Sequence, residues 1–135
     1  MAATLFDDVI TFIYTRDIET SVDFYENRLG LECVYDYGGC RIYRASKHGY
    51  LGICNREDAP AQVPQYGKRN IVFTFVTDDV DGWFARLAEK GVYPTDPPGA
   101  SEKYGVYSGF ITDPNGYFLE IQKFLNPDWS PGDID

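Results

Sequence analysis

The chain has 135 residues and a formal net charge of −9, and 44% of its residues are apolar and 16% aromatic. This size and composition predict one folded domain, and the negative charge argues against a nucleic-acid partner, whose phosphates would be repelled. Since no apolar run approaches the ~18 residues of a membrane span and the N-terminus lacks a signal-peptide pattern, we expect a cytoplasmic protein with no membrane partner.

The first half of the chain predicts a strand, a helix and three further strands. The first strand covers 9–17, and the helix begins after Asp17, which is placed as an N-cap. Gly30 follows the helix and can adopt the left-handed conformation that ends it. The strand-like runs that come next are 31–37, 40–45 and 50–55.

The second half repeats this order at an offset of about sixty residues. A strand over 70–80 leads into a helix that begins after Asp79 and ends at Gly91. The strand-like runs that follow are 92–96, 105–112 and 117–124. The sequence therefore predicts a duplicated β-α-β-β-β unit.

The domain organisation follows from the duplication. We expect a single domain over 1–124, made of repeat one at 7–55, a linker rich in proline at 56–69, and repeat two at 70–124. Residues 125–135 are expected to form a polar tail.

The cysteines are three in number and lie apart, with no CxxC spacing. Such a pattern supports neither a disulfide framework nor a structural zinc site. We expect Cys33, Cys40 and Cys54 to be buried thiols.

Glu120 is the residue that most needs a functional explanation. It lies in the last predicted strand, after the strong turn sequence at 113–116. Because side chains alternate along a strand, Glu120 shares a face with Phe118 and Gln122. A carboxylate in that setting could be a metal ligand, a catalytic base, a member of an ion pair or a solvated charge.

Two motifs in the chain carry a resemblance to a known family. They are D-I-x-x-S-x-x-F-Y-x-x-x-L-G-L at 17–31 and D-P-N-G-Y-x-L-E-I at 113–121. The chain resembles the vicinal oxygen chelate superfamily, which includes glyoxalase I, extradiol dioxygenases, and fosfomycin and bleomycin resistance proteins. Over 7–124 the resemblance implies an α+β fold in which eight strands form a curved cup, with a small-molecule ligand in the hollow and usually a homodimer.

The resemblance also implies where a metal would bind. In metal-using relatives, histidines in the first strands and glutamates that end the repeats supply the donors, and Glu120 matches the last of these positions. The other positions are occupied by residues that cannot coordinate a metal: Ile10, Ile71 or Val72, and Ile53 or Gly52. Since a divalent ion needs about three or four N or O donors, we expect no bound metal. A site improvised from Glu120, His48 and Cys54 stays open, although His48 lies in a predicted turn.

A carboxylate inside the implied cup would need a cation, retained water or a proton. Arg41, Arg44 or Lys103 could supply an internal cation. Alternatively, aromatic residues and the acid together form a receptor for a cationic or planar ligand, through stacking, cation–π contact and a charge-assisted hydrogen bond. The candidate ligand-binding residues are Glu120, Phe118, Gln122, Ile10, Phe12, Tyr14, Tyr107 and Phe110.

These features lead to three hypotheses for function. The first is a metal-free binding protein without a cofactor that sequesters a cationic or aromatic compound, as in antibiotic resistance. The second is a metal-dependent lyase, isomerase or dioxygenase with Glu120 as a ligand to a divalent cofactor. The third is metal-free catalysis with Glu120 as general base.

Overall fold

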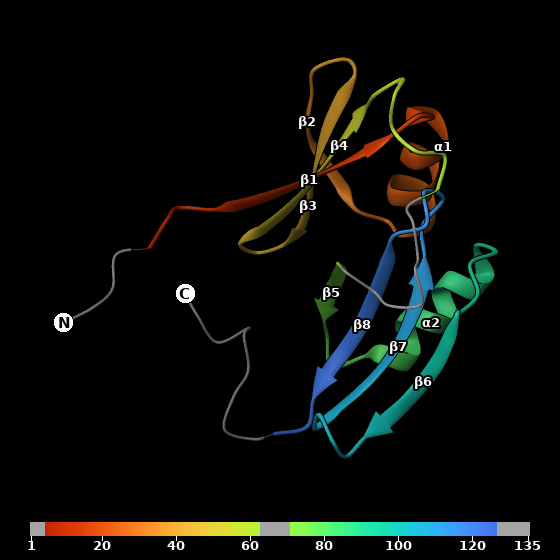
Figure 1. Ribbon diagram of the computed structural model, residues 1–135. Helices are drawn as coiled ribbons and strands as arrows, with labels where there is room; N and C mark the ends of the chain where they lie inside the picture. The colour runs from red at the N-terminus through yellow and green to blue at the C-terminus, as the bar shows by residue number, and fades with distance from the viewer. Residues whose placement is uncertain (1–4, 63–70, 127–135) are drawn as a thin grey trace. The chain divides into compact units, whose positions relative to one another are not determined.

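The computed structural model describes residues 5–62 and 71–126 of the chain (Figure 1). The chain divides into two compact units, Met1–Ala61 and Gln62–Asp135. Each unit contains a strand, a helical segment and three more strands in that order, which confirms the predicted duplication. Residues 63–70 of the expected linker and 127–135 of the expected tail lie outside the described residues.

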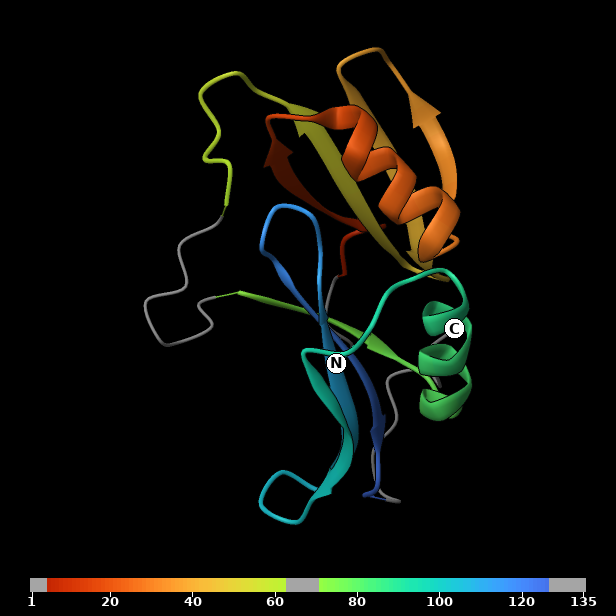
Figure 2. The same cartoon turned by 90° about the vertical axis from the view of Figure 1, so that its right-hand side faces the viewer.

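The first unit is a mixed four-stranded sheet with the strand order β1-β4-β3-β2. Its strands are β1 (Val9–Thr15), β2 (Glu32–Asp36), β3 (Cys40–Ser46) and β4 (Gly49–Asn55). Strand β1 runs parallel to β4, whereas β2, β3 and β4 are antiparallel neighbours. A helical segment between β1 and β2 lies across one face of this sheet (Figure 2).

That helical segment begins as predicted but changes its hydrogen bonding. Asp17 is the N-cap of α1 (Ile18–Val22), and its carboxylate accepts from the Thr20 N–H at 3.2 Å. The segment then continues as a π-helix, η1 (Asp23–Arg28), and the amide of Leu29 donates to the carbonyl five residues earlier at 2.8 Å. Apolar spacing predicts a helix here but does not distinguish α from π hydrogen bonding.

The core of the first unit lies between this segment and the sheet. The sheet contributes Ile13, Tyr43, Leu51 and Ile53, and the helical segment contributes Phe24, Tyr25 and Leu29, all 4% exposed or less. The rings of Tyr25 and Tyr43 stack with their centroids 6.2 Å apart. Each such buried side chain contributes about 1.5–3 kcal/mol to folding, so this face of the sheet is fixed by packing.

The second unit repeats the arrangement with the strand order β5-β8-β7-β6. Its elements are β5 (Val72–Val76), α2 (Val80–Glu89), β6 (Asp96–Ser101), β7 (Val106–Thr112) and β8 (Phe118–Phe124). Strand β5 runs parallel to β8. Asp79 caps α2 by accepting from the Gly82 N–H at 3.1 Å, and Gly91 follows the helix with φ of 79°, both as predicted. The buried apolar residues of this unit include Val80, Phe84, Leu87, Ile111, Leu119 and Ile121.

The position of β6 corrects the sequence prediction. A strand was expected over 92–96, and the strand instead covers Asp96–Ser101, with the sequence DPPGAS. Two prolines are compatible with this strand because it lies at the edge of the sheet. A Cβ on Gly109 of β7 would lie 2.7 Å from Phe84 Cζ and 2.9 Å from Pro98 N, so glycine permits the close approach of helix and edge strand.

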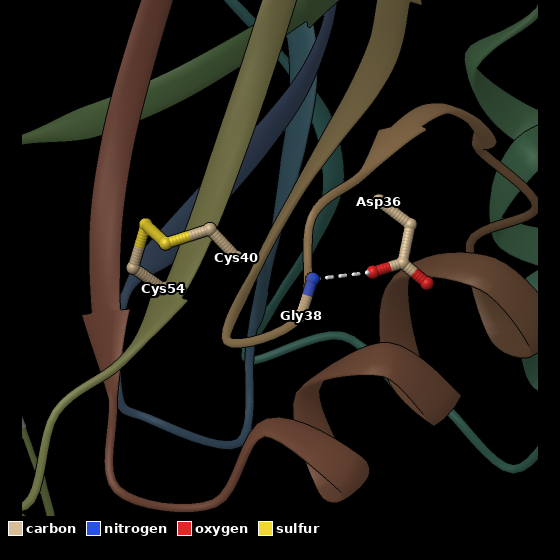
Figure 3. Close-up of a disulfide and its surroundings, with 4 residues drawn as sticks. All are labelled: Asp36, Gly38, Cys40 and Cys54. Atoms are coloured by element: carbon tan, nitrogen blue, oxygen red, sulfur yellow. Dashed lines mark hydrogen bonds between the residues drawn. A yellow bond between two sulfur atoms is a disulfide. The ribbon is translucent and has the colours of Figure 1, made fainter.

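The cysteines give a second correction. Cys40 and Cys54 form a disulfide between β3 and β4, and Cys33 is free and partly exposed, so the prediction of three buried thiols is wrong (Figure 3). The ladder places Cys40 directly opposite Cys54, with Cα atoms 4.1 Å apart. This pairing depends on strand register, which the spacing of cysteines along the chain does not show.

None of the helices in the described part of the chain is long and apolar enough to cross a membrane.

Candidate functional site

Glu120 lies on the face of the second sheet that is opposite α2. Leu119 and Ile121 are buried in the core that α2 covers. By alternation along β8, Phe118, Glu120 and Gln122 therefore share the other face, as the sequence predicts. We call this the open face of the second sheet.

A row of side chains crosses the open face at Glu120. Strand register places Thr74 of β5 on one side of Glu120 and Phe110 of β7 on the other. The Thr74 hydroxyl donates to Glu120 Oε1 at 2.9 Å, which orients the carboxylate. Gln122 lies one pleat along, between Val76 and Ser108.

A second carboxylate continues the row. Asp96 of β6 is the register partner of Phe110, so Phe110 lies between Glu120 and Asp96 on three neighbouring strands. Neighbouring strands are about 4.8 Å apart. The backbone register therefore places an acidic residue on the strand to each side of Phe110, and the register of β6 shifts directly after Asp96. Sequence reasoning missed Thr74 and Asp96, because cross-strand register has no local signal and the prolines after Asp96 masked its strand.

Three predicted site residues share the open face of the first sheet, which is the face opposite α1 and η1. Ile10, Phe12 and Tyr14 are 43%, 39% and 40% exposed, and they alternate with the buried Ile13 and Thr15.

Close packing and cations further define this open face of the first sheet. The Phe12 ring lies over Gly52, where a Cβ would overlap it. The Arg56 guanidinium lies 4.7 Å from the centre of the Tyr14 ring, and Arg44 lies 5.1 Å from that of Tyr50. This face thus carries rings with cations, whereas the open face of the second sheet carries acids.

Tyr107 does not lie with Glu120. Its hydroxyl donates to Asp81 Oδ1 of α2 at 2.6 Å, so its side chain is on the helix-covered face of the second sheet. This hydrogen bond raises the pKa of Tyr107 above its usual value. A pocket of about 280 Å³ adjoins it, lined by Asp78, Asp79, Val80, Asp81, Tyr107, Lys123 and Leu125.

The cations considered as internal partners for Glu120 have other contacts. Arg41 pairs with Glu26 at 2.7 Å and Asp36 at 3.4 Å. The other two cations are also engaged: Arg44 lies 3.7 Å from Glu32, and Lys103 lies over the ring of Tyr104.

The donors near Glu120 do not fit a divalent metal. Within residues 5–62 and 71–126, no group of three or more His, Cys, Asp and Glu side chains gathers in a metal-binding arrangement. His48 is exposed in the turn between β3 and β4. Cys54 is bound in the disulfide, which removes the improvised set of Glu120, His48 and Cys54 because a disulfide sulfur offers no thiolate.

Known proteins with the same fold come from several bacteria. A structure described as a glyoxalase/bleomycin resistance protein/dioxygenase from Nocardioides superposes with a TM-score of 0.73 at 20% identity, covering 100% of this chain and 93% of that one. TnmS3, an antibiotic binding protein from Streptomyces sp. CB03234, superposes with a TM-score of 0.67 at 22% identity, covering 91% of this chain and 98% of that one. At these identities the likeness establishes the fold alone.

Sequence comparison gives a relative and a family. The metallothiol transferase FosB of Lysinibacillus sphaericus (strain C3-41) is 29% identical over 105 residues, which are 78% of this chain and 73% of that protein. The model of the Glyoxalase/Bleomycin resistance protein/Dioxygenase superfamily matches residues 8–121. Since that match covers both units, the chain belongs to this superfamily, the vicinal oxygen chelate group.

Proposed function

We propose that this protein is a metal-free binding protein for a planar, cationic small molecule, which it holds on the open face of the second sheet. The observation that carries the proposal is the strand register, which places Phe110 between two acidic residues, Glu120 and Asp96. A positive ring system stacked on Phe110 would be attracted by the aromatic face and by an acid on each side.

Each contact in this proposed site has a defined task. A cation within about 6 Å of an aromatic ring gains about 0.5–2 kcal/mol, more as water is excluded. Thr74 holds Glu120 Oε1, and Oε2 is the atom that would accept a charge-assisted hydrogen bond from the ligand. Phe118, which is half-buried, extends the apolar surface along β8, whereas Gln122 is only 9% exposed and offers its amide little access to a ligand. Ile10, Phe12 and Tyr14 offer a second surface, with one aliphatic and two aromatic side chains, in the first unit.

The relatives support this proposal to different degrees. TnmS3 binds an antibiotic on the same fold, which favours sequestration. FosB favours the second candidate, a metal-dependent enzyme in which Glu120 would be a ligand. The donor set near Glu120 speaks for the first candidate, because no sufficient group of metal donors gathers there among the described residues.

A thermal-shift and calorimetry screen tests the proposal. We expect cationic aromatic compounds to raise the unfolding temperature, since a ligand at 100 times its Kd adds about 2.7 kcal/mol. Glu120→Gln keeps the shape of the side chain and should weaken binding about tenfold or more, which is about 1.4 kcal/mol. Glu89→Gln, at an exposed position on α2, is the matched control and should bind normally. Equal binding of neutral analogues, or full binding by Glu120→Gln, would refute the electrostatic part.

Elemental analysis separates the two candidates. Protein purified without added metal or chelator should contain well under one equivalent of Zn, Ni, Mn or Fe per chain. A stoichiometric transition metal that Glu120→Gln loses, and Glu89→Gln keeps, would favour the metal-dependent enzyme.

Two further expectations belong to this proposal. A homodimer is the usual assembly that the resemblance implies, and light scattering coupled to size exclusion should give the mass of two chains. A cytoplasmic location stays a prediction that cell fractionation would test.

A further inference from the structure

The Cys40–Cys54 disulfide joins two sulfur atoms that the backbone alone would keep together. Cys40 and Cys54 are register partners in the β3–β4 ladder, and the next pair along the ladder is Arg41 with Ile53. On the other side, the Asn55 N–H donates to the Gly39 carbonyl at 2.7 Å. The strands are thus paired on both sides of the disulfide, so its two thiols would stay adjacent after reduction.

The disulfide lies on the open face of the first sheet. Tyr43 and Ile53 point to the helix-covered core, so Cys40 and Cys54 point to the other face by alternation. Register places Cys54 beside Tyr14 of β1. Cys54 is 8% exposed, whereas Cys40 is only partly buried, so Cys40 is the half of the bond that a small thiol can reach.

We propose that Cys40 and Cys54 form a thiol–disulfide exchange site for low-molecular-weight thiols. The thiolate of such a thiol attacks Sγ of Cys40, the Sγ–Sγ bond breaks, and Cys54 leaves with the electron pair as a thiolate. A second thiol then attacks the outer sulfur of the mixed disulfide and releases the oxidised thiol. The two protein thiolates take protons from water. The protein disulfide is reduced by two electrons, and two small thiols are oxidised to one disulfide.

This site is independent of the proposed ligand on the second sheet. Its mixed disulfide at Cys40 would place the body of the small thiol on the open face of the first sheet, on β3 beside Cys54. The redox state of Cys40 and Cys54 would also depend on the compartment, because cysteine thiols are kept reduced in the cytosol and form disulfides in oxidising compartments.

A count of free thiols in the full-length protein tests the exchange. The folded protein is incubated with reduced or oxidised glutathione. It is then denatured in the presence of an alkylating agent, and its intact mass is measured by mass spectrometry. We expect one alkylated cysteine, Cys33, in the oxidised protein, three after millimolar reduced glutathione, and one again after oxidised glutathione. The far-UV circular dichroism should not change through the cycle. A bond that glutathione reduces only in denaturant, a loss of secondary structure on reduction, or three thiols that never return to one would each overturn the proposal.

Single variants identify the reactive sulfur. Cys54→Ser leaves Cys40, which should trap oxidised glutathione as a mixed disulfide about tenfold faster than Cys54 does in Cys40→Ser, because thiol reaction follows access. Cys33→Ser is the control and should keep the complete cycle. Equal trapping at both positions would overturn the assignment of Cys40 as the point of entry, and the wild-type cycle tests the site if either variant fails to fold.

Discussion

Single residues in this chain have roles that follow from short-range hydrogen bonds. Asp17 and Asp79 cap their helices because each follows a strand and precedes an apolar helical pattern, so both could be predicted from the sequence. Glu120 and its face could be predicted from alternation along β8. Thr74 and Asp96 could not, because they meet Glu120 and Phe110 only through pairing between strands.

Replacing the Asp17 cap should give a pH-dependent loss of stability. Hydrogen bonds from the side chain and backbone of Thr20 hold the pKa of Asp17 below its usual 3.8. A group with a lowered folded pKa stabilises the protein above its unfolded pKa and loses that effect as pH falls through the folded value. Asp17→Ala should therefore lower the unfolding temperature by a few degrees near neutral pH. Melts followed by circular dichroism should show this deficit narrowing below about pH 4, and a constant deficit would contradict the account.

Removing the Tyr43 hydroxyl should destabilise the first unit. That hydroxyl donates to Glu26 Oε1 at 3.0 Å, and burial, followed by the nearby Glu26, raises the pKa of Tyr43. Tyr43→Phe keeps the buried ring and should cost about 1 kcal/mol in urea unfolding. The control is Tyr104→Phe, at a residue 70% exposed, and it should be near neutral. Equal costs for both variants would show that the hydroxyl contributes little.

At the scale of the elements, features with a local sequence signal could be predicted, whereas features that depend on packing between elements could not. The turn before β8 follows its sequence, since the Asp113 carboxylate accepts from the Asn115 and Tyr117 amides at 2.8 Å each and Gly116 has φ of 92°. The π-helical hydrogen bonding of η1 and the place of β6 could not be predicted, because neither has a local sequence signal. A proline-rich edge strand resembles a loop when only its own residues are considered, because the partner strand supplies its order.

The contact at Gly109 makes a prediction for the second sheet. An added methyl would meet Phe84 of α2 and backbone atoms of Asp96 and Pro98 at 3.0 Å or less. Gly109→Ala should therefore cost about 1–3 kcal/mol, as overpacking does. In Gly99→Ala nothing lies within 4 Å of the new carbon, and the stability should change little. Chemical denaturation of both variants makes the comparison, and a neutral Gly109→Ala would mean that β6 can shift without cost.

For the whole molecule, membership of the superfamily accounts for the two repeated sheets, and the chain carries a formal net charge of −9. The fold does not determine the sign of this charge, but the sign affects which ligands the protein attracts. Acids on the open face of the second sheet and the net negative charge both favour cationic ligands.

Salt should weaken the proposed binding through this electrostatic contribution. At about 0.01 M ionic strength charges act over about 30 Å, and at 1 M over about 3 Å. The affinity for a cationic aromatic ligand should fall several-fold between those limits, whereas a neutral analogue should show little change. Calorimetric titration at both ionic strengths measures this, and a cation whose affinity does not depend on salt would argue against charge as the source of selectivity.

Strand β1 lies at an edge of its sheet, and its seven residues, VITFIYT, contain neither proline nor charge. Such a segment is prone to pair with copies of itself in a chain that has not finished folding. Asp8 on one side and Arg16 on the other bracket it with charge. These two residues fit the role of aggregation gatekeepers, so their value to the protein would appear in the yield of refolding and not in the stability of the folded state.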